Sequence, residues 1–288
     1  MEYIEGWRYR NGGMLSDNSP HLEANLKPIE DGSIWKHPNK PMVARWTSDF
    51  DCGYETEWYY VIKDEPFDLS SLKANHRKNI TRGNRHFEVK VIDPKEYIDE
   101  LYEVATAAYE SYPKEYRPHI SYETFKGWID DSEESGIKQV TFGAFSLEDG
   151  KLCGNMSIDE LDGYGRGAAL KAIPAYEKFY LNDAILYGML EYYKDKLAEG
   201  YYIDLGERNI QHKTAIQDKL IRQYGFRKAY CKLNLAYPPI IGFIVKIIYP
   251  FRRLLKKLDT VHPLCHKVNG VLAMEEIARA CKKQHKAA

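Results

Sequence analysis

Hydrophobic and polar positions follow a regular pattern most clearly between residues 182 and 236. Apolar residues at helical spacing predict a helix over Asn182–Leu197, and Gly200 separates it from an apolar strand at Tyr201–Leu205. A second helix then leads to a last strand over Arg227–Ala236. Four residues come directly after the first strand: Gly206, Glu207, Arg208 and Asn209. Open α/β sheets bind ligands at this end of their strands, so this segment indicates more about function than any other.

An earlier run of elements is predicted from residue 86 to residue 172. Phe87–Ile92 alternates apolar and polar residues and favours a strand, and Pro94 suits the first turn of the helix that follows. A second helix is expected over residues 121–134, with Ser121 as its N-cap. Three strands come next, the first two joined as a hairpin: Lys138–Leu147, Leu152–Asp159 and Gly165–Ala172.

The N-terminal part has weaker periodicity. Residues 1–40 are rich in Gly, Pro, Asn and Asp, which predicts loops with at most one short strand. The aromatic and β-branched segment Glu57–Ile62 favours a strand. A basic helix is expected to begin at Asp68 or Ser70 and to run to Arg82.

The formal net charge of −1 hides a basic C-terminal part. Residues 238–288 hold ten Lys or Arg and three Asp or Glu, so this part carries about +7 and the rest about −8. Such a tail favours an anionic partner, either membrane lipid or nucleic acid. Its first block, 238–257, combines an apolar run with four cations near its end. This block predicts an in-plane helix on an anionic membrane surface, and the alternatives are a helix packed on its own domain or a dimer contact.

The remaining composition is that of an ordinary globular protein, with 44% hydrophobic and 29% charged residues. The five scattered cysteines form no CxxC pair, and His76, His86 and His212 lie apart, so we expect reduced thiols and no metal site. The acidic N-terminus does not resemble a signal peptide, and no apolar run is long enough to span a bilayer. We therefore expect a cytoplasmic protein, peripheral at the inner face of the membrane if its tail binds lipid.

The order of predicted elements from residue 86 is β, α, α, β, β, β, α, β, α, β. With Asn209, Ala215 and Tyr224-Gly225-Phe226 after the penultimate strand, this order resembles the GCN5-related N-acetyltransferase (GNAT) superfamily over residues 86–237. The resemblance implies an α+β fold, α/β-like in its pattern, with a mixed and mostly antiparallel central sheet flanked by helices. It divides the chain into an accessory region with the strand and basic helix (1–85), a GNAT-like domain (86–237) and an amphipathic basic helical tail (238–288).

The segment from Asn182 to Leu233 is most similar to the branch that contains the FemAB-type peptidoglycan aminoacyltransferases. Asp204-Leu205-Gly206-Glu207-Arg208 resembles that branch's Asp-Phe-Gly-Arg segment, and Phe67–Ile80 resembles its basic helix before the sheet. FemAB-type enzymes usually carry two GNAT-like halves, and this chain is too short for two complete ones. The resemblance implies an amine-bearing acceptor, among cell-envelope or polysaccharide precursors.

The acyl donor depends on one departure from the superfamily. Members that use acetyl-CoA carry a Gln/Arg-x-x-Gly-x-Gly/Ala loop whose backbone N–H groups hold the pyrophosphate. Residues 171–183 occupy that place here and contain no glycine. This departure argues against ordinary acetyl-CoA binding, although it leaves the use of another acyl-CoA open. FemAB-type enzymes also lack a usable loop, and they take their acyl group from aminoacyl-tRNA. The resemblance therefore implies aminoacyl-tRNA as the alternative donor.

Acyl transfer to an amine needs a base for the ammonium proton and an acid for the leaving group. Glu207 follows the strand where a base would reach a cleft, and its alternative role is a loop carboxylate paired with Arg208. Tyr224 aligns with the general-acid tyrosine of many GNAT enzymes, and its alternative role is packing of the last helix. Asp204 and Asn209 are candidates for substrate binding or for capping the helix that follows.

The basic helix carries candidates for phosphate contacts at one-turn spacing: Lys73, Arg77, Lys78 and Arg82. A solvated helix face explains the same pattern equally well. Tyr180 is a further candidate for substrate binding. Two hypotheses result: a transferase that moves an acyl or aminoacyl group onto an amine, or a catalytically inactive GNAT-like module that binds an anionic ligand, membrane or protein. An open cleft that ends at Glu207 favours the first, and a cleft filled by Tyr176, Phe179 and Tyr180 favours the second.

Overall fold

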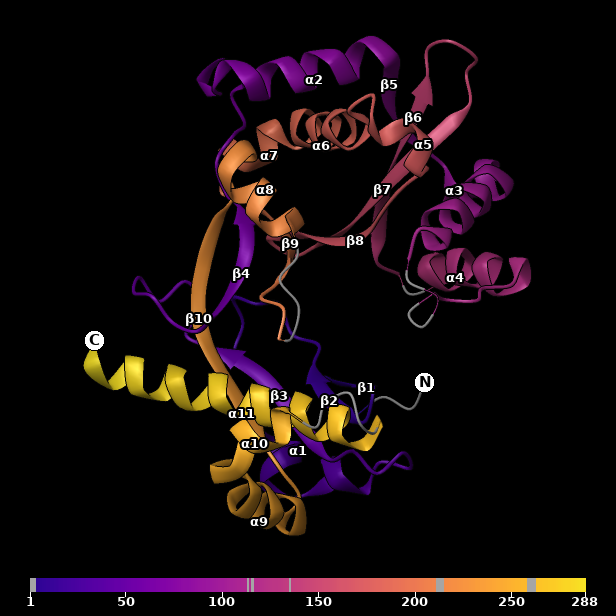
Figure 1. Cartoon of the computed structure of the whole chain (residues 1–288). Coiled ribbons are helices and arrows are strands. Elements are labelled where there is room, and N and C mark those ends of the chain that lie inside the picture. The colour runs from indigo at the N-terminus through magenta and orange to yellow at the C-terminus, as the bar shows by residue number, and fades with distance from the viewer. Residues whose placement is uncertain (1–3, 113, 115–116, 135, 211–214, 258–262) are drawn as a thin grey trace. The chain divides into compact units, whose positions relative to one another are not determined.

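The computed structural model describes residues 4–112, 114, 117–134, 136–210, 215–257 and 263–288 (Figure 1). The chain forms two compact units that each draw on separate stretches of sequence. Unit 1 comprises Met1–Val61, Glu207–Ala215 and Lys228–Ala288, and unit 2 comprises Ile62–Gly206 and Ile216–Arg227. No helix among the described residues has the length and apolar content needed to cross a membrane.

Unit 2 is built on five strands in the order β9-β8-β7-β6-β5. Their bounds are Phe87–Ile92 for β5, Lys138–Ser146 for β6, Leu152–Leu161 for β7, Tyr164–Ala172 for β8 and Tyr202–Glu207 for β9. β5, β6, β7 and β8 pair antiparallel in sequence, whereas β9 joins β8 in parallel. This mixed, mostly antiparallel sheet confirms the predicted fold class.

Helices cover both faces of this sheet (Figure 1). The first group is α2 (Ala74–His86), α5 (Pro174–Glu177), α6 (Leu181–Tyr192), α7 (Lys194–Ala198) and α8 (Ala215–Tyr224), of which α6 packs on β5, β6 and β7. The second group is α3 (Ile98–Glu110) and α4 (Tyr122–Glu134), which pack on β6, β7 and β8. Ser121 caps α4 as predicted, because its Oγ accepts a hydrogen bond from the Thr124 N–H at 3.1 Å.

Unit 1 holds strands β1 (Trp7–Arg10), β2 (Gly13–Ser16), β3 (Val43–Ser48) and β10 (Arg227–Ala236), which follow one another in the sheet in that order. Strand β4 (Trp58–Lys63) ends in unit 2, and β10 starts there. The helices of unit 1 are α1 (Lys27–Glu30), α9 (Pro239–Ile248), α10 (Arg252–Lys256) and α11 (Pro263–Ala287). Trp58, Cys231 and Leu233 pack against Ile277 and Cys281 of α11, and these side chains form a core.

Most predicted elements agree with these bounds to within a few residues, and three differ. Residues 1–40 contain two strands, because Asn11 and Gly12, at φ values of 50° and 85°, form the turn of a hairpin. The helix predicted over Asn182–Leu197 is broken at Tyr193, which is fully buried and packs on Phe142. The basic helix begins later than expected, at Ala74, after a short 3-10 turn over Leu69–Ser71.

Candidate active site

The two parallel strands of unit 2 are paired over a short distance only. The Cα partners are Tyr164 with Tyr202, Gly165 with Ile203, and Arg166 with Asp204. β8 continues to Ala172 and β9 to Glu207 without further pairing between these two strands, all of whose residues are described. The backbone edge of β8 beyond Arg166 is therefore free of a neighbouring strand on that side.

A cavity of about 420 Å³ lies at this unpaired edge, and we call it the cleft cavity. Its walls are mostly aliphatic, with Leu205 from β9, Leu186 from α6 and Leu220 from α8. Its polar side chains come from the turn after α3, from β8, and from α5 and α6: Ser111, Tyr112, Lys171, Glu177 and Asn182. An aliphatic pocket with a few polar groups is the usual form of a small-molecule site.

A second cavity of about 420 Å³ lies between the sheet and helices α3 and α4, and we call it the α3–α4 cavity. Its helical wall is aromatic and includes Phe125 and Trp128, whereas its strand side is polar. On that polar side Thr141 and Ser157 bond each other through their hydroxyls at 3.0 Å. The two cavities share four consecutive residues of β8: Ala168, Ala169, Leu170 and Lys171.

Asn155 is a buried polar residue of the α3–α4 cavity. Its side chain lines the cavity and is only 8% exposed. Among the described residues its amide makes no side-chain hydrogen bond, although buried amides nearly always have one. A ligand or water in the cavity would supply this missing partner.

The strand segment shared by the two cavities contains a β-bulge. Ser157 pairs with Ala169 and Ile158 pairs with Gly167, so Ala168 is the extra residue of β8. A bulge takes the extra residue out of the regular hydrogen-bond ladder. The backbone N–H of Ala168 is thus a candidate donor to a ligand that spans both cavities.

Lys171 brings a positive charge to the same place. Its Nζ lies 4.3 Å from the ring centre of Tyr109 and 3.5 Å from the hydroxyl of Tyr112. An ammonium over an aromatic ring is held by cation–π attraction while keeping its charge. Lys171, Asn155 and Ala168 were not predicted as site residues, because nothing in the spacing of residues 155–171 indicates where the strands separate.

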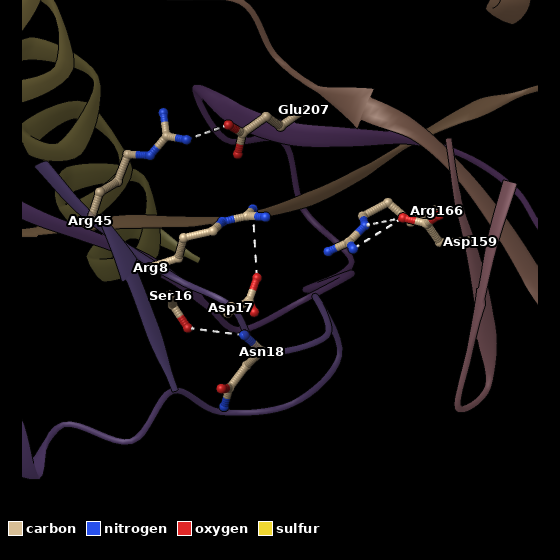
Figure 2. A network of polar contacts seen from close by, with 8 residues as sticks. All are labelled: Arg8, Ser16, Asp17, Asn18, Arg45, Asp159, Arg166 and Glu207. Atoms are coloured by element: carbon tan, nitrogen blue, oxygen red, sulfur yellow. Dashed lines mark hydrogen bonds and ion pairs between the residues drawn. The ribbon is translucent and has the colours of Figure 1, made fainter. Parts of the chain in front are cut away.

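The predicted polar segment after β9 is occupied by contacts of its own. The buried Asp204 carboxylate accepts a hydrogen bond from the Gly206 N–H at 2.8 Å. Glu207 forms an ion pair with Arg45 (Figure 2), whose guanidinium also lies 5.5 Å from the ring centre of Trp58. Arg208 pairs with Glu57 at 3.1 Å and donates its backbone N–H to the Tyr59 carbonyl.

Glu207, Arg208 and the exposed Asn209 belong to unit 1 and do not line either cavity. Asp204 belongs to unit 2, two residues beyond the first β8–β9 pair. The transferase hypothesis called for an open cleft that ends at Glu207. The cleft cavity of unit 2 is open, and Glu207, a residue of unit 1, is not among the residues that line it. Within unit 2, an ion pair of Arg166 with Asp159 at 3.1 Å ties β8 to β7 (Figure 2).

Tyr224 lies in a buried polar cluster at the end of α8. Its hydroxyl donates to the Asp183 carboxylate at 2.7 Å, and Lys219 Nζ contacts the other oxygen of Asp183 at 2.8 Å. Burial, and then the charge and hydrogen bond of Asp183, raise the pKa of Tyr224 well above its ordinary value. Tyr224 is 1% exposed and does not line either cavity, which favours the packing role over the acid role.

The basic helix α2 presents its four candidate cations, Lys73, Arg77, Lys78 and Arg82, to solvent. Arg82 donates a hydrogen bond to the Tyr180 hydroxyl at 3.1 Å, so two predicted site residues meet. Gly83 allows this approach, since a Cβ built there would stand 2.7 Å from the Tyr180 carbonyl oxygen. Tyr180 directly precedes α6, two residues before Asn182 of the cleft cavity.

The glycine-free stretch before α6 folds as the one-turn helix α5 followed by Tyr180 at a φ of 65°. Its aromatic side chains leave the cleft cavity open. Tyr176 packs edge-on to Phe87, and Phe179 packs on His86 at 5.0 Å between ring centres. In the part of the chain that the structure describes, no three His, Cys, Asp or Glu side chains gather as a metal site.

No protein-family model and no curated protein matches this sequence. Among solved structures, FemX aligns at a TM-score of 0.55 and 10% identity, over 84% of this chain and 85% of FemX. L-PGS from Bacillus licheniformis aligns at 0.48 and 13% identity over 83% of both chains. The C-terminal domain of a putative lysylphosphatidylglycerol synthetase from Agrobacterium fabrum aligns at 0.49 and 10% identity over 83% and 82%. The FemX alignment, at a TM-score above 0.5, shows that this chain has a FemX-like, GNAT-type fold.

Proposed function

We propose that this protein is a transferase that moves an acyl or aminoacyl group onto an amine. One observation carries the proposal: two cavities of equal size are both lined by Ala168–Lys171 of β8. A transfer between two substrates needs the donor carbonyl and the acceptor nitrogen to reach one point from separate binding sites. The FemX-like fold and the resemblance to FemAB-type enzymes support the same class of reaction.

The cleft cavity suits the acyl donor, and aminoacyl-tRNA is the donor that we favour. Its aliphatic walls accept an acyl or aminoacyl side chain, and Asn182 lies just beyond the Arg82–Tyr180 pair. The exposed cations of α2 would contact phosphates outside the cavity. The glycine-free segment 171–183 lacks the loop that holds a pyrophosphate, which disfavours acyl-CoA.

The α3–α4 cavity suits the amine-bearing acceptor. Asn155 offers an amide without a partner among the described residues, and the hydroxyls of Thr141 and Ser157 lie on the same side of the cavity. Hydrogen-bonding groups of this kind orient a polar acceptor within an otherwise aromatic pocket. A cell-envelope or polysaccharide precursor remains the acceptor class that the family resemblance suggests.

In the proposed reaction the acceptor nitrogen attacks the donor carbonyl carbon, and the bond to the leaving oxygen or sulfur breaks. The Ala168 N–H would stabilise the oxyanion, with Lys171 supplying positive charge nearby. Glu207 is the base candidate that the family resemblance suggests; it belongs to unit 1, where Arg45 pairs with it, and it lines neither cavity, so we assign no base among the residues of unit 2. Tyr224 remains a candidate acid only if its bond to Asp183 is broken during turnover.

The donor assignment is tested by ligand-induced thermal stabilisation of two variants. A Cβ built on Gly167 stands 2.9 Å from Leu205 Cδ2, so Gly167→Leu fills the cleft between β8 and β9. Gly127→Leu in α4 is the matched control, since a Cβ there meets nothing within 4 Å. We expect aminoacyl-tRNA to stabilise the wild type and Gly127→Leu, but not Gly167→Leu.

Three results bear on this test. Stabilisation of Gly167→Leu equal to that of the wild type contradicts a donor site in the cleft cavity. Stabilisation by acetyl-CoA in place of aminoacyl-tRNA keeps the transferase and overturns the choice of donor. Tight binding of an anionic ligand without any transfer product favours the alternative, an inactive GNAT-like binding module.

A further inference from the structure

The segment that follows β10 in unit 1 is strongly amphipathic. It comprises α9, a 3-10 turn over Tyr249–Phe251, and α10. From Tyr237 to Lys257 the sequence contains five Lys or Arg and no Asp or Glu. Figure 1 shows α9 and α10 beside α11.

The apolar side chains of this segment point mainly to solvent. Ile240 is 75% exposed, Phe243 is 65% exposed and Leu254 is 61% exposed. Three more exposed apolar side chains, Ile244, Ile247 and Phe251, lie between them, and positions 240, 244, 247, 251 and 254 recur every three or four residues, with Phe243 beside Ile244. Such spacing places them along one side of a helical segment, and soluble monomers rarely expose a contiguous apolar surface of this kind.

The opposite side of the segment is fixed to α11. Val245 is buried, and Arg252 pairs with Glu276 at 2.9 Å. Tyr237 donates to Glu275 at 2.9 Å, and Asn269 Nδ2 donates to the Leu255 carbonyl at 3.0 Å. Because these contacts hold one side in place, the apolar stripe cannot turn inward without breaking them.

Cations flank the stripe. Lys246, Arg253, Lys256 and Lys257 are exposed and form no ion pair with a described residue. We propose that α9 and α10 form a membrane-docking surface that lies in the plane of an anionic lipid bilayer. The six apolar side chains would enter the acyl boundary, and the four cations would contact lipid phosphates. An apolar protein partner would not need this cationic border.

The test is co-sedimentation of the full-length protein with vesicles of equal parts phosphatidylglycerol and phosphatidylcholine. Leu147→Asp is the matched control for Leu254→Asp, because it makes the same change at a leucine of unit 2 that is 58% exposed. We expect Leu254→Asp combined with Phe243→Asp to lower the partition coefficient about a hundredfold or more. Leu147→Asp should leave it unchanged, and Lys256→Glu with Lys257→Glu should lower it about thirtyfold or more.

Equal sedimentation of the wild type and the Phe243→Asp, Leu254→Asp double variant would overturn the proposal. So would equal binding to pure phosphatidylcholine vesicles, because the cations would then play no part. A dimer that the same double variant dissociates, with no binding of the wild type to either vesicle, would assign the surface to a second copy instead. None of these measurements depends on the proposed transferase activity.

Discussion

Replacing Tyr224 by Phe separates the two roles considered for this residue. The substitution removes one hydroxyl and leaves the ring against Phe67, whose ring centre lies 5.9 Å away. It also removes a buried 2.7 Å hydrogen bond to a carboxylate, while Lys219 remains as the partner of Asp183. A buried hydrogen bond to a charged group contributes about 1.5–3 kcal/mol, so we expect a loss of that size in the free energy of unfolding.

Urea denaturation followed by circular dichroism measures this loss as a lower transition midpoint at constant slope. Tyr187→Phe is the matched control, because Tyr187 also packs on Phe67 and its hydroxyl makes no hydrogen bond to a described residue. We expect the control to change the unfolding free energy by less than about 0.5 kcal/mol. An unchanged midpoint for Tyr224→Phe, together with a large loss of transfer rate, would refute the packing role and support the acid.

Two further changes test the electrostatics of unit 2. Burial raises the pKa of Glu160, but bonds to Lys138 and Lys196 outweigh it and hold that pKa below its ordinary value. The stabilisation from this depressed pKa is fully present above the unfolded-state pKa and is lost as the pH falls through the depressed folded-state pKa. Glu160→Gln should therefore cost about 1 kcal/mol at neutral pH and progressively less as the pH falls through that range; an equal cost at neutral and strongly acidic pH would contradict this. Lys73→Glu with Arg77→Glu should abolish aminoacyl-tRNA binding in a filter assay without lowering thermal stability. Lys126→Glu with Lys151→Glu makes the same charge change elsewhere in unit 2, and equal tRNA binding by both double variants would exclude α2 as the contact.

The pattern of apolar residues was sufficient to predict the sheet of unit 2. β5 has the bounds that the alternation predicted, and Ser121 caps α4 as expected; β10, which lies almost entirely in unit 1, also has its predicted bounds. These features depend on residues that are close in sequence, and the spacing of the apolar residues among them indicates which face of a helix or strand is buried. The hairpin at Asn11-Gly12 was not predicted, because its flanking strands of four residues are too short to show an alternation.

The candidate site was harder to predict, because it depends on where strands stop pairing. Ala168 is an ordinary small residue in the sequence, and only the register with β7 makes it the extra residue of a bulge. Asn155 is one polar residue in a buried strand, and its lack of a partner follows from its neighbours on β6 and β8. Asp183, which holds Tyr224 and Lys219, was predicted only as part of a helix.

The central claim is that acyl transfer takes place at the segment of β8 that lines both cavities. The most direct measurement is the protein-dependent rate of acyl transfer from aminoacyl-tRNA to hydroxylamine, a small surrogate for the amine acceptor. The account predicts a rate above background for the wild type and for Gly127→Leu, and the background rate for Gly167→Leu. A Gly167→Leu rate equal to that of the wild type would contradict it.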